Sequence, residues 1–342
     1  MTMSKFTRRD LLRLLTLGAG SLSLDRLLTA CGIKPATVHP TSFSTFVPPT
    51  NTIPSSTEAA PPVASSSSTS LPVPDLVVAR GGEPEQLARQ ALAVFGGLKA
   101  FVPKGARVVV KPNICVAYHT YEYAATTNPW LVGALVKMAF EAGASSVTVF
   151  DFPFGGTEEE AYAVSGIADQ VRAAGGEMIP MPDFKFIQTQ IPQGLSLKAA
   201  HAFKDALEAD VLIDVPIAKH HGDAGLTLGM KNLMGLVLNR GAIHIDLHQR
   251  IADLATLFKP KLTVVDAIRI LVNNGPSGGN LKDVRKLDTL IVSPDIVAAD
   301  SYATTLFDLQ PGDIGYIAAA ARMGLGNSDL KSLRIQEIQV GA

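Results

Sequence analysis

Short apolar runs alternate with longer amphipathic stretches over most of the chain. The runs DLVVA (75–79), ARVVVKPN (106–113) and SSVTVFD (145–151) have the length and β-branched content of buried strands. The stretches 83–98 and 128–144 between them carry apolar residues at helical spacing. Strands separated by helices predict an α/β fold, with a mainly parallel, layered sheet and helices on both faces.

One segment departs from this alternation of strand and helix patterns. Residues 185–199 alternate apolar and polar positions more strictly and contain Gly194, which predicts a hairpin inserted into the pattern. The rest of the pattern predicts helices over 157–176, 229–238 and 246–258, and strands over 210–217 and 261–267.

Composition narrows the class of protein. The 342 residues are 47% hydrophobic, which is enough to bury a sizeable core. Net charge is −1 and no cluster of Lys and Arg stands out beyond the N-terminus, so nucleic acid is not an expected partner. The two cysteines, Cys31 and Cys115, cannot by themselves hold a cysteine-ligated iron–sulfur cluster.

The N-terminal segment has the features of an export signal. Arg8 and Arg9 precede the weakly apolar stretch 14–24, an order that resembles a twin-arginine signal. The sequence LTACG (28–32) resembles the lipobox of bacterial lipoproteins, in which Cys31 would be lipidated. We therefore expect the twin-arginine export machinery as a partner.

These features also predict a location. We expect the protein on the outer face of the cytoplasmic membrane, or as a periplasmic or outer-membrane lipoprotein, anchored by lipid on Cys31. The expected parts are a signal with lipobox (1–31), a disordered Pro/Ser/Thr-rich tether (32–74) and an α/β domain (75–342).

Polar side chains follow four of the predicted strands where each strand ends. In open α/β sheets, ligands bind beyond the carboxyl ends of the strands, so these side chains are expected to share a cleft. They are Lys111, Asn113, Asp151, Lys219, His220, His221 and Asp266.

The predicted cleft has the chemistry of an anion site. Lys111, Lys219 and Lys231 would neutralise a phosphate or carboxylate, and backbone N–H groups at the start of the 229–238 helix would add a cradle. Gly278, in the loop NNGPSGGN, would let the backbone approach the ligand closely. Asn113 and Asn232 complete the expected anion-binding set.

His220 is the candidate acid or base, with Asp151 or Asp266 as its orienting partner or as a metal ligand. Neighbouring residues of a strand point in opposite directions, so only one of His220 and His221 is expected to face the cleft. We favour the pair Lys219–His220 for that position.

A divalent metal is the alternative to an anion. His244 and His248 are four residues apart on a predicted helix, a spacing that can hold a metal, and His220 would be the third ligand. No Glu completes an H-E-x-x-H motif. Cys115 lies near the cleft as a small buried thiol, a nucleophile or a metal ligand.

Several segments together resemble the bacterial and archaeal domain of unknown function family 362. They are VVVKPNI (108–114), 126–151, VLIDVPIAKHHGDAGLTLGMKNLMG (211–235), 248–268, NNGPSGG (273–279) and 293–307. The resemblance implies no settled reaction. It implies recurrent motif positions at Lys111, Asn113, Lys219, His220, Lys231, Asn232, Asp266 and Asp300. The family is often fused to ferredoxin-like modules, which implies redox chemistry and a redox partner protein, but this chain lacks those cysteines.

Two functions remain open at this point. The first is an oxidoreductase-related enzyme that acts on a small anionic substrate or cofactor. The second is a noncatalytic, lipid-tethered protein that binds a metal or an anion. The cofactor is not identified by the residues.

Overall fold

The computed structural model describes residues 72–341. Its main sheet has the strand order β12-β1-β11-β10-β7-β2-β3-β4, and β8 pairs with β10 and with β9. The strands are β1 (Leu76–Arg80), β2 (Arg107–Pro112), β3 (Ser146–Val149), β4 (Glu177–Met178), β7 (Val211–Val215), β8 (Ile217–His221), β9 (Gly225–Thr227), β10 (Leu262–Leu271), β11 (Val284–Ser293) and β12 (Ile335–Gln339).

The sheet is mainly parallel. β11 runs antiparallel to its neighbours β1 and β10, whereas the other pairs along this strand order are parallel. The helices are α2 (Pro84–Val94), α3 (Pro129–Glu141), α4 (Glu158–Val164), α5 (Ile167–Ala173), α6 (Lys204–Leu207), α7 (Gly229–Asn232), α8 (Arg240–Ile243), α9 (Leu247–Leu257), α10 (Ile296–Thr304) and α11 (Gly315–Arg322).

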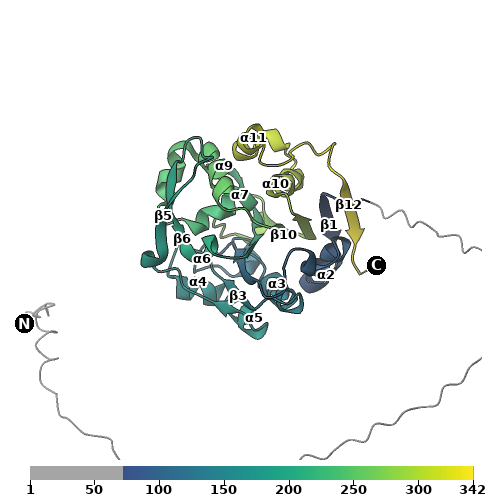
Figure 1. The fold of residues 1–342 in the computed structure, drawn as a ribbon. Coiled ribbons are helices and arrows are strands. Elements are labelled where there is room, and N and C mark those ends of the chain that lie inside the picture. The colour runs from purple at the N-terminus through teal and green to yellow at the C-terminus, as the bar shows by residue number, and fades with distance from the viewer. Residues whose placement is uncertain (1–71, 342) are drawn as a thin grey trace, which may run out of the picture. The chain divides into compact units, whose positions relative to one another are not determined.

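Helices cover both faces of the sheet (Figure 1). In β1, Leu76 and Val78 pack into the apolar cluster that includes α9, α10 and α11, while Val77 and Ala79 pack into the cluster with α2, α3 and α5. This alternation follows from the period of two in a strand. The predicted fold class is confirmed, and the helices fix the sheet so that its carboxyl edge can carry a site.

The inserted hairpin is also present. β5 (Phe186–Gln190) and β6 (Ala199–Phe203) form a separate antiparallel pair in which Phe186 lies opposite Phe203. The predicted stretch, 185–199, covers β5 but ends where β6 begins, so the hairpin extends four residues further than predicted. Phe186 and Phe203 are buried in the larger apolar cluster, which joins the hairpin to the domain.

Three predicted elements are divided. The helix over 157–176 breaks into α4 and α5 at Gly166, whose φ of 74° lies in the left-handed region that glycine tolerates. The strand over 210–217 divides at Pro216 into β7 and β8. The helix over 229–238 consists of α7 and a 3-10 turn (Leu233–Leu236).

None of the helices between residues 72 and 341 combines the length and the apolar character that a membrane span requires. The predictions for Arg8, Arg9, Cys31 and the tether up to residue 71 lie outside the described residues.

Candidate functional site

A pocket of about 370 Å³ opens beyond the carboxyl ends of β2 and β3. Strand β8 and helix α7 form further walls. The structure thus brings most of the predicted site residues to one place. Those that line the pocket are Asn113, Cys115, Asp151, Lys219, His221, Lys231, Asn232 and His244.

Lys111 lies beneath this pocket as part of a closed ion pair. Its ammonium is fully buried and donates to Asp151 Oδ1 at 2.8 Å, Asn232 Oδ1 at 2.8 Å and Pro112 O at 2.9 Å. These contacts use the three N–H bonds of the group. Lys111 therefore positions its neighbours, and the geometry does not support our expectation that it contacts an anion.

Asp151 completes the same arrangement. Its Oδ2 accepts from the backbone N–H of Ile114 at 2.5 Å, and its Oδ1 accepts from Phe152 N at 2.9 Å in addition to Lys111. A carboxylate held by an ammonium and two amides is a structural anchor. It does not orient His220, which was one of its predicted roles.

A chain of amides continues from the ion pair to Lys219. Asn232 Oδ1 also accepts from Asn113 Nδ2 at 3.0 Å, and Asn113 Oδ1 accepts from Lys219 Nζ at 2.9 Å. Lys219 also donates to Ala125 O at 2.6 Å. Burial lowers the pKa of Lys219, and the approach of the Lys111 ammonium lowers it further.

Gly235 is required by this close packing. A Cβ at this position would overlap Asp151 Oδ1 and lie 2.8 Å from Lys111 Nζ. The absence of a side chain lets the turn after α7 lie directly against the ion pair, and it leaves open the pocket wall that Gly235 forms.

Lys231 differs from the other two lysines because its ammonium has no oxygen partner among residues 72–341. Its nearest hydrogen-bond acceptor is the thioether sulfur of Met234 at 3.6 Å, although the residue is only 8% exposed. Burial, followed by the charge of Lys219, lowers the pKa of Lys231 to about 8. A buried cation without a counter-charge is costly, and a bound anion would remove that cost.

His221, not His220, faces the pocket. Strand β8 turns Lys219 and His221 to one side, and His220 to the other, where its Nδ1 accepts from Gly275 N at 3.2 Å. The favoured Lys219–His220 pair was therefore wrong. Predicting one strand over 210–217 placed the histidines after its end. The chain instead breaks at Pro216, and both histidines belong to the new strand β8, in which alternate residues share a face.

The ring of His221 is held as a neutral donor. Its Nδ1 accepts from the backbone N–H groups of Asp223 at 3.2 Å and Ala224 at 3.3 Å, which leaves the ring proton on Nε2. Burial, followed by the charge of Lys231, lowers the pKa of His221 to about 3. At neutral pH this imidazole is uncharged, so its Nε2–H is available to donate to a ligand and the ring is a poor base.

The three predicted metal ligands do not converge. His244 lies at the pocket wall, 3.7 Å from Asp223 Oδ2. His248 is packed against Tyr316, and its buried Nδ1 has no hydrogen-bond partner among residues 72–341. Within the described part of the chain, no group of three His, Cys, Asp or Glu side chains could hold a metal ion. The predicted set of His220, His244 and His248 is corrected accordingly.

Asp266 and Gly278 lie away from the pocket lining. Asp266 accepts from Asn128 N at 2.7 Å and Ile268 N at 3.0 Å, so its carboxylate organises the start of α3 and a bend in β10. Burial raises the pKa of Asp266 to about 6. The loop after β10 reaches the pocket through Pro276 instead of Gly278.

The expected anion cradle at the start of α7 is filled by the protein itself. Asp300 of α10 accepts from Gly229 N at 2.7 Å and from Met230 N at 2.9 Å. The backbone donors that we assigned to a ligand are therefore already occupied. Asp300 instead fixes the helix that carries Lys231 and Asn232.

The pocket residues that sequence reasoning missed include the polar side chains of Thr227 and Arg240. The hydroxyl of Thr227 is buried and has no hydrogen-bond partner among the described residues. Arg240 donates to Phe152 O at 2.7 Å and Pro153 O at 3.0 Å. Neither stands in a recognisable motif, so only the fold reveals them. Cys115, which was predicted near the cleft, lines the pocket and lies 3.5 Å from Pro276 O.

Comparison with known proteins finds a matching family model and a related protein. The family model described as Domain of unknown function (DUF362) matches residues 108–305, more than half of the chain. A thylakoid-associated protein of Synechocystis sp. is 29% identical over 246 residues, which cover 69% of this chain and 74% of that protein.

Solved structures match as well, at low identity. The lactate racemase apoprotein from Thermoanaerobacterium thermosaccharolyticum has 14% identity and a TM-score of 0.39, with 62% of this chain and 53% of that chain covered. The match thus spans about half the length of the racemase. A likeness of this size carries no argument about function.

Proposed function

The chain belongs to the family of the domain of unknown function DUF362, and we propose that it binds a small anion, a carboxylate or a phosphate, in the pocket beside Lys231. The observation that carries the proposal is the Lys231 ammonium, which is buried without an oxygen partner among residues 72–341. An anion in the pocket would supply the missing counter-charge.

Two neutral donors support the same ligand class. The Nε2–H of His221 and the hydroxyl of Thr227 belong to side chains that line the pocket. Together with Lys231 they offer hydrogen-bond donors to a ligand rich in acceptors. The carboxylate of Asp151, which also lines the pocket, is already neutralised by Lys111.

The proposal extends to catalysis through Lys231. A lysine with a pKa of about 8 exchanges its proton near neutral pH, as a general acid or base must. In this proposal Lys231 replaces His220 as the proton-transfer group. Oxidoreductase chemistry and a redox partner protein remain proposals that rest on the family resemblance alone.

The test is calorimetric titration with inorganic phosphate and with acetate. We expect Lys231→Met to weaken binding by about tenfold or more, because the charge-assisted contact is lost. Lys231→Arg should retain most of the affinity. The matched control is Lys282→Met, because Lys282 is exposed and lies outside this pocket. Equal affinity of Lys231→Met and the wild type would refute the assignment.

A further inference from the structure

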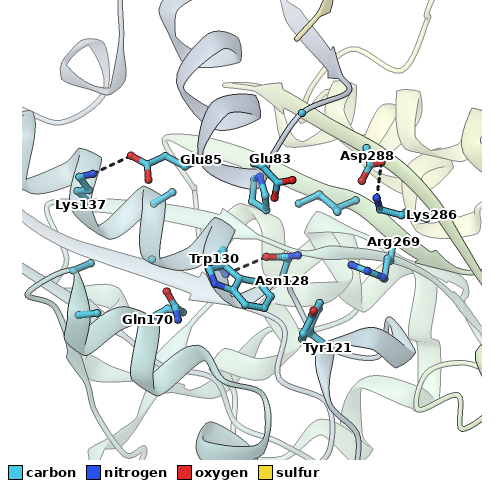
Figure 2. A pocket seen from close by; sticks show the side chains of 17 residues that line it. Glu83, Glu85, Tyr121, Asn128, Trp130, Lys137, Gln170, Arg269, Lys286 and Asp288 are labelled. Carbon is cyan, nitrogen blue, oxygen red and sulfur yellow. Dashed lines mark hydrogen bonds and ion pairs between the residues drawn. The ribbon is translucent and has the colours of Figure 1, made fainter. Parts of the chain in front are cut away.

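A second cavity, of about 660 Å³, lies beside the starts of α2 and α3 and the ribbon of β10 and β11 (Figure 2). It shares no lining residue with the pocket at Lys231. The segment between β2 and α3 provides Tyr121 and Asn128 to its lining, and the proposed anion binding at Lys231 makes no use of them.

Aromatic surface is available in this cavity. The Trp130 side chain is 45% exposed although it belongs to the first turn of α3. Tyr121 packs edge-on against it with the ring centroids 4.8 Å apart. The Arg269 guanidinium lies over the Tyr121 ring, 5.3 Å from the ring centroid. Exposed indole beside a stacked arginine is a surface on which flat rings bind well.

Asn128 supplies a hydrogen-bond donor that the protein does not use. Its Oδ1 accepts from Trp130 N at 3.0 Å and Leu131 N at 3.3 Å, which fixes the orientation of the amide. The Nδ2 group then has no acceptor among the described residues, although the side chain is only 5% exposed. Figure 2 shows this nitrogen on the side of the amide toward Arg269.

Arg269 is the unmatched cation of the cavity. No carboxylate in the described range pairs with it, whereas Lys137 is paired with Glu85 at 3.1 Å and Lys286 with Asp288 at 3.1 Å. The remaining acidic lining residue, Glu83, is exposed at the start of α2 and could accept from hydroxyl or amino groups of a ligand.

We propose that this cavity binds a nucleoside monophosphate, with its phosphate at Arg269 and Asn128 and its base against Trp130. Arginine and an amide N–H₂ are suitable donors to phosphate oxygens. A cavity of this volume lies within the range of small-molecule and cofactor sites and has room for a base, a ribose and a phosphate. A small aromatic acid would leave much of it unfilled.

Trp130 is the one tryptophan of the chain, so its fluorescence reports on this cavity alone. The experiment titrates the full-length protein with AMP, adenosine and benzoate, and follows the emission of Trp130. Calorimetry with the same three probes is run in parallel. We expect saturable quenching by AMP, and binding of adenosine and benzoate that is weaker by about tenfold or more.

The variants separate the phosphate contact from general effects. Arg269→Ala should weaken AMP binding by about tenfold or more and leave adenosine unchanged, while Arg269→Lys should be intermediate. Arg285→Ala is the matched control, because Arg285 is exposed and lies next to Lys286 on the opposite face of β11. Circular dichroism checks that each variant is folded.

Three results would overturn the proposal. One is the absence of AMP binding by both fluorescence and calorimetry. Another is equal affinity for AMP and adenosine, which would remove the role of the phosphate. The third is equal affinity for AMP and benzoate, which would remove the role of the nucleoside.

Discussion

Lys111 and Lys231 are both buried lysines, and they differ in the partners that their ammonium groups find. Lys111 has a carboxylate, an amide oxygen and a carbonyl within 2.9 Å. Lys231 has a thioether sulfur at 3.6 Å. A satisfied ion pair holds the fold, whereas an unmatched buried charge lowers stability unless a ligand compensates it. We therefore place binding at Lys231 and positioning at Lys111.

A substitution at Gly235 tests the ion pair between Lys111 and Asp151 directly. Gly235→Ala would bring a Cβ into overlap with Asp151 and within 2.8 Å of Lys111 Nζ. Displacing either partner leaves a buried charge unpaired, so we expect a loss of about 3 kcal/mol or more in the free energy of unfolding. Urea denaturation measures it.

Gly222→Ala is the matched control. An added Cβ at Gly222 has no atom within 4 Å, so the variant should stay within about 0.5 kcal/mol of the wild type. If Gly235→Ala lowers the free energy of unfolding no more than Gly222→Ala does, Gly235 is not in close contact with the ion pair.

Residue types were easier to predict than their orientations. Polar side chains after successive strands indicated Asn113, Asp151 and Lys219, which line the pocket, but the same pattern included Asp266 and His220, which do not. Which histidine faces inward depended on the break at Pro216, and the role of Lys111 depended on Asp151 and Asn232, which are distant in sequence. Tertiary partners of this kind leave no local pattern.

At the scale of elements, α7 shows how a short helix is fixed where its own hydrogen bonds are few. Four residues cannot form a stable isolated helix. Asp300 of α10 accepts from two of its first N–H groups, and Asn232 is bound to Asp214 Oδ1 at 2.8 Å. The helix is thus held from both ends, and Lys231 lies between the two anchors.

Asp300→Ala should loosen this helix. The N–H groups of Gly229 and Met230 would be left buried and unpaired, at a cost of about 1–3 kcal/mol each. We expect a lower melting temperature together with weaker phosphate binding, and a smaller effect for Asp300→Asn, which retains one acceptor.

The control for this prediction is Asp246→Ala. Asp246 precedes α9, is exposed and makes no side-chain capping bond. Its removal should therefore leave the melting temperature and the affinity for phosphate nearly unchanged. Unchanged melting and binding in Asp300→Ala would show that α7 does not depend on this carboxylate.

The type and order of most helices and strands could be predicted from the local pattern of apolar and polar residues. Alternating strands and helices were enough to predict a parallel sheet with both faces covered, and strict alternation was enough to predict the hairpin. Sequence alone did not reveal that Gly166 divides a helix, because a glycine within a helical pattern can also be tolerated.

At the scale of the whole molecule, the domain and its N-terminal segment make separate contributions. We propose that lipid on Cys31 holds the protein at a membrane after twin-arginine export. The proposed binding activity resides in the domain and does not depend on this location.

The location is tested by cell fractionation. Cys31→Ser should move the protein from the membrane fraction to the soluble extracytoplasmic fraction, because the acceptor thiol for lipid is lost. Replacing Arg8 and Arg9 by Lys should keep the protein in the cytoplasm, and Cys115→Ser serves as the control. Retention of Cys31→Ser in the membrane fraction would contradict the proposed anchor.

The proposed anion binding also depends on pH in a defined direction. Lys231 carries its charge below its pKa of about 8 and loses it above, so affinity for an anion must fall as pH rises. His221, with a pKa of about 3, stays neutral throughout. Lys219 also has a lowered pKa, so a variant must distinguish the two lysines.

The most direct measurement is calorimetric titration with sulfate, an anion of constant charge, between about pH 7.5 and 9.5. We predict that the wild type and Cys115→Ser lose about tenfold in affinity over this range, while Lys231→Met binds weakly with little dependence on pH. The same strong, pH-dependent binding in Lys231→Met as in the wild type would contradict the assignment of Lys231 as the anion-binding group.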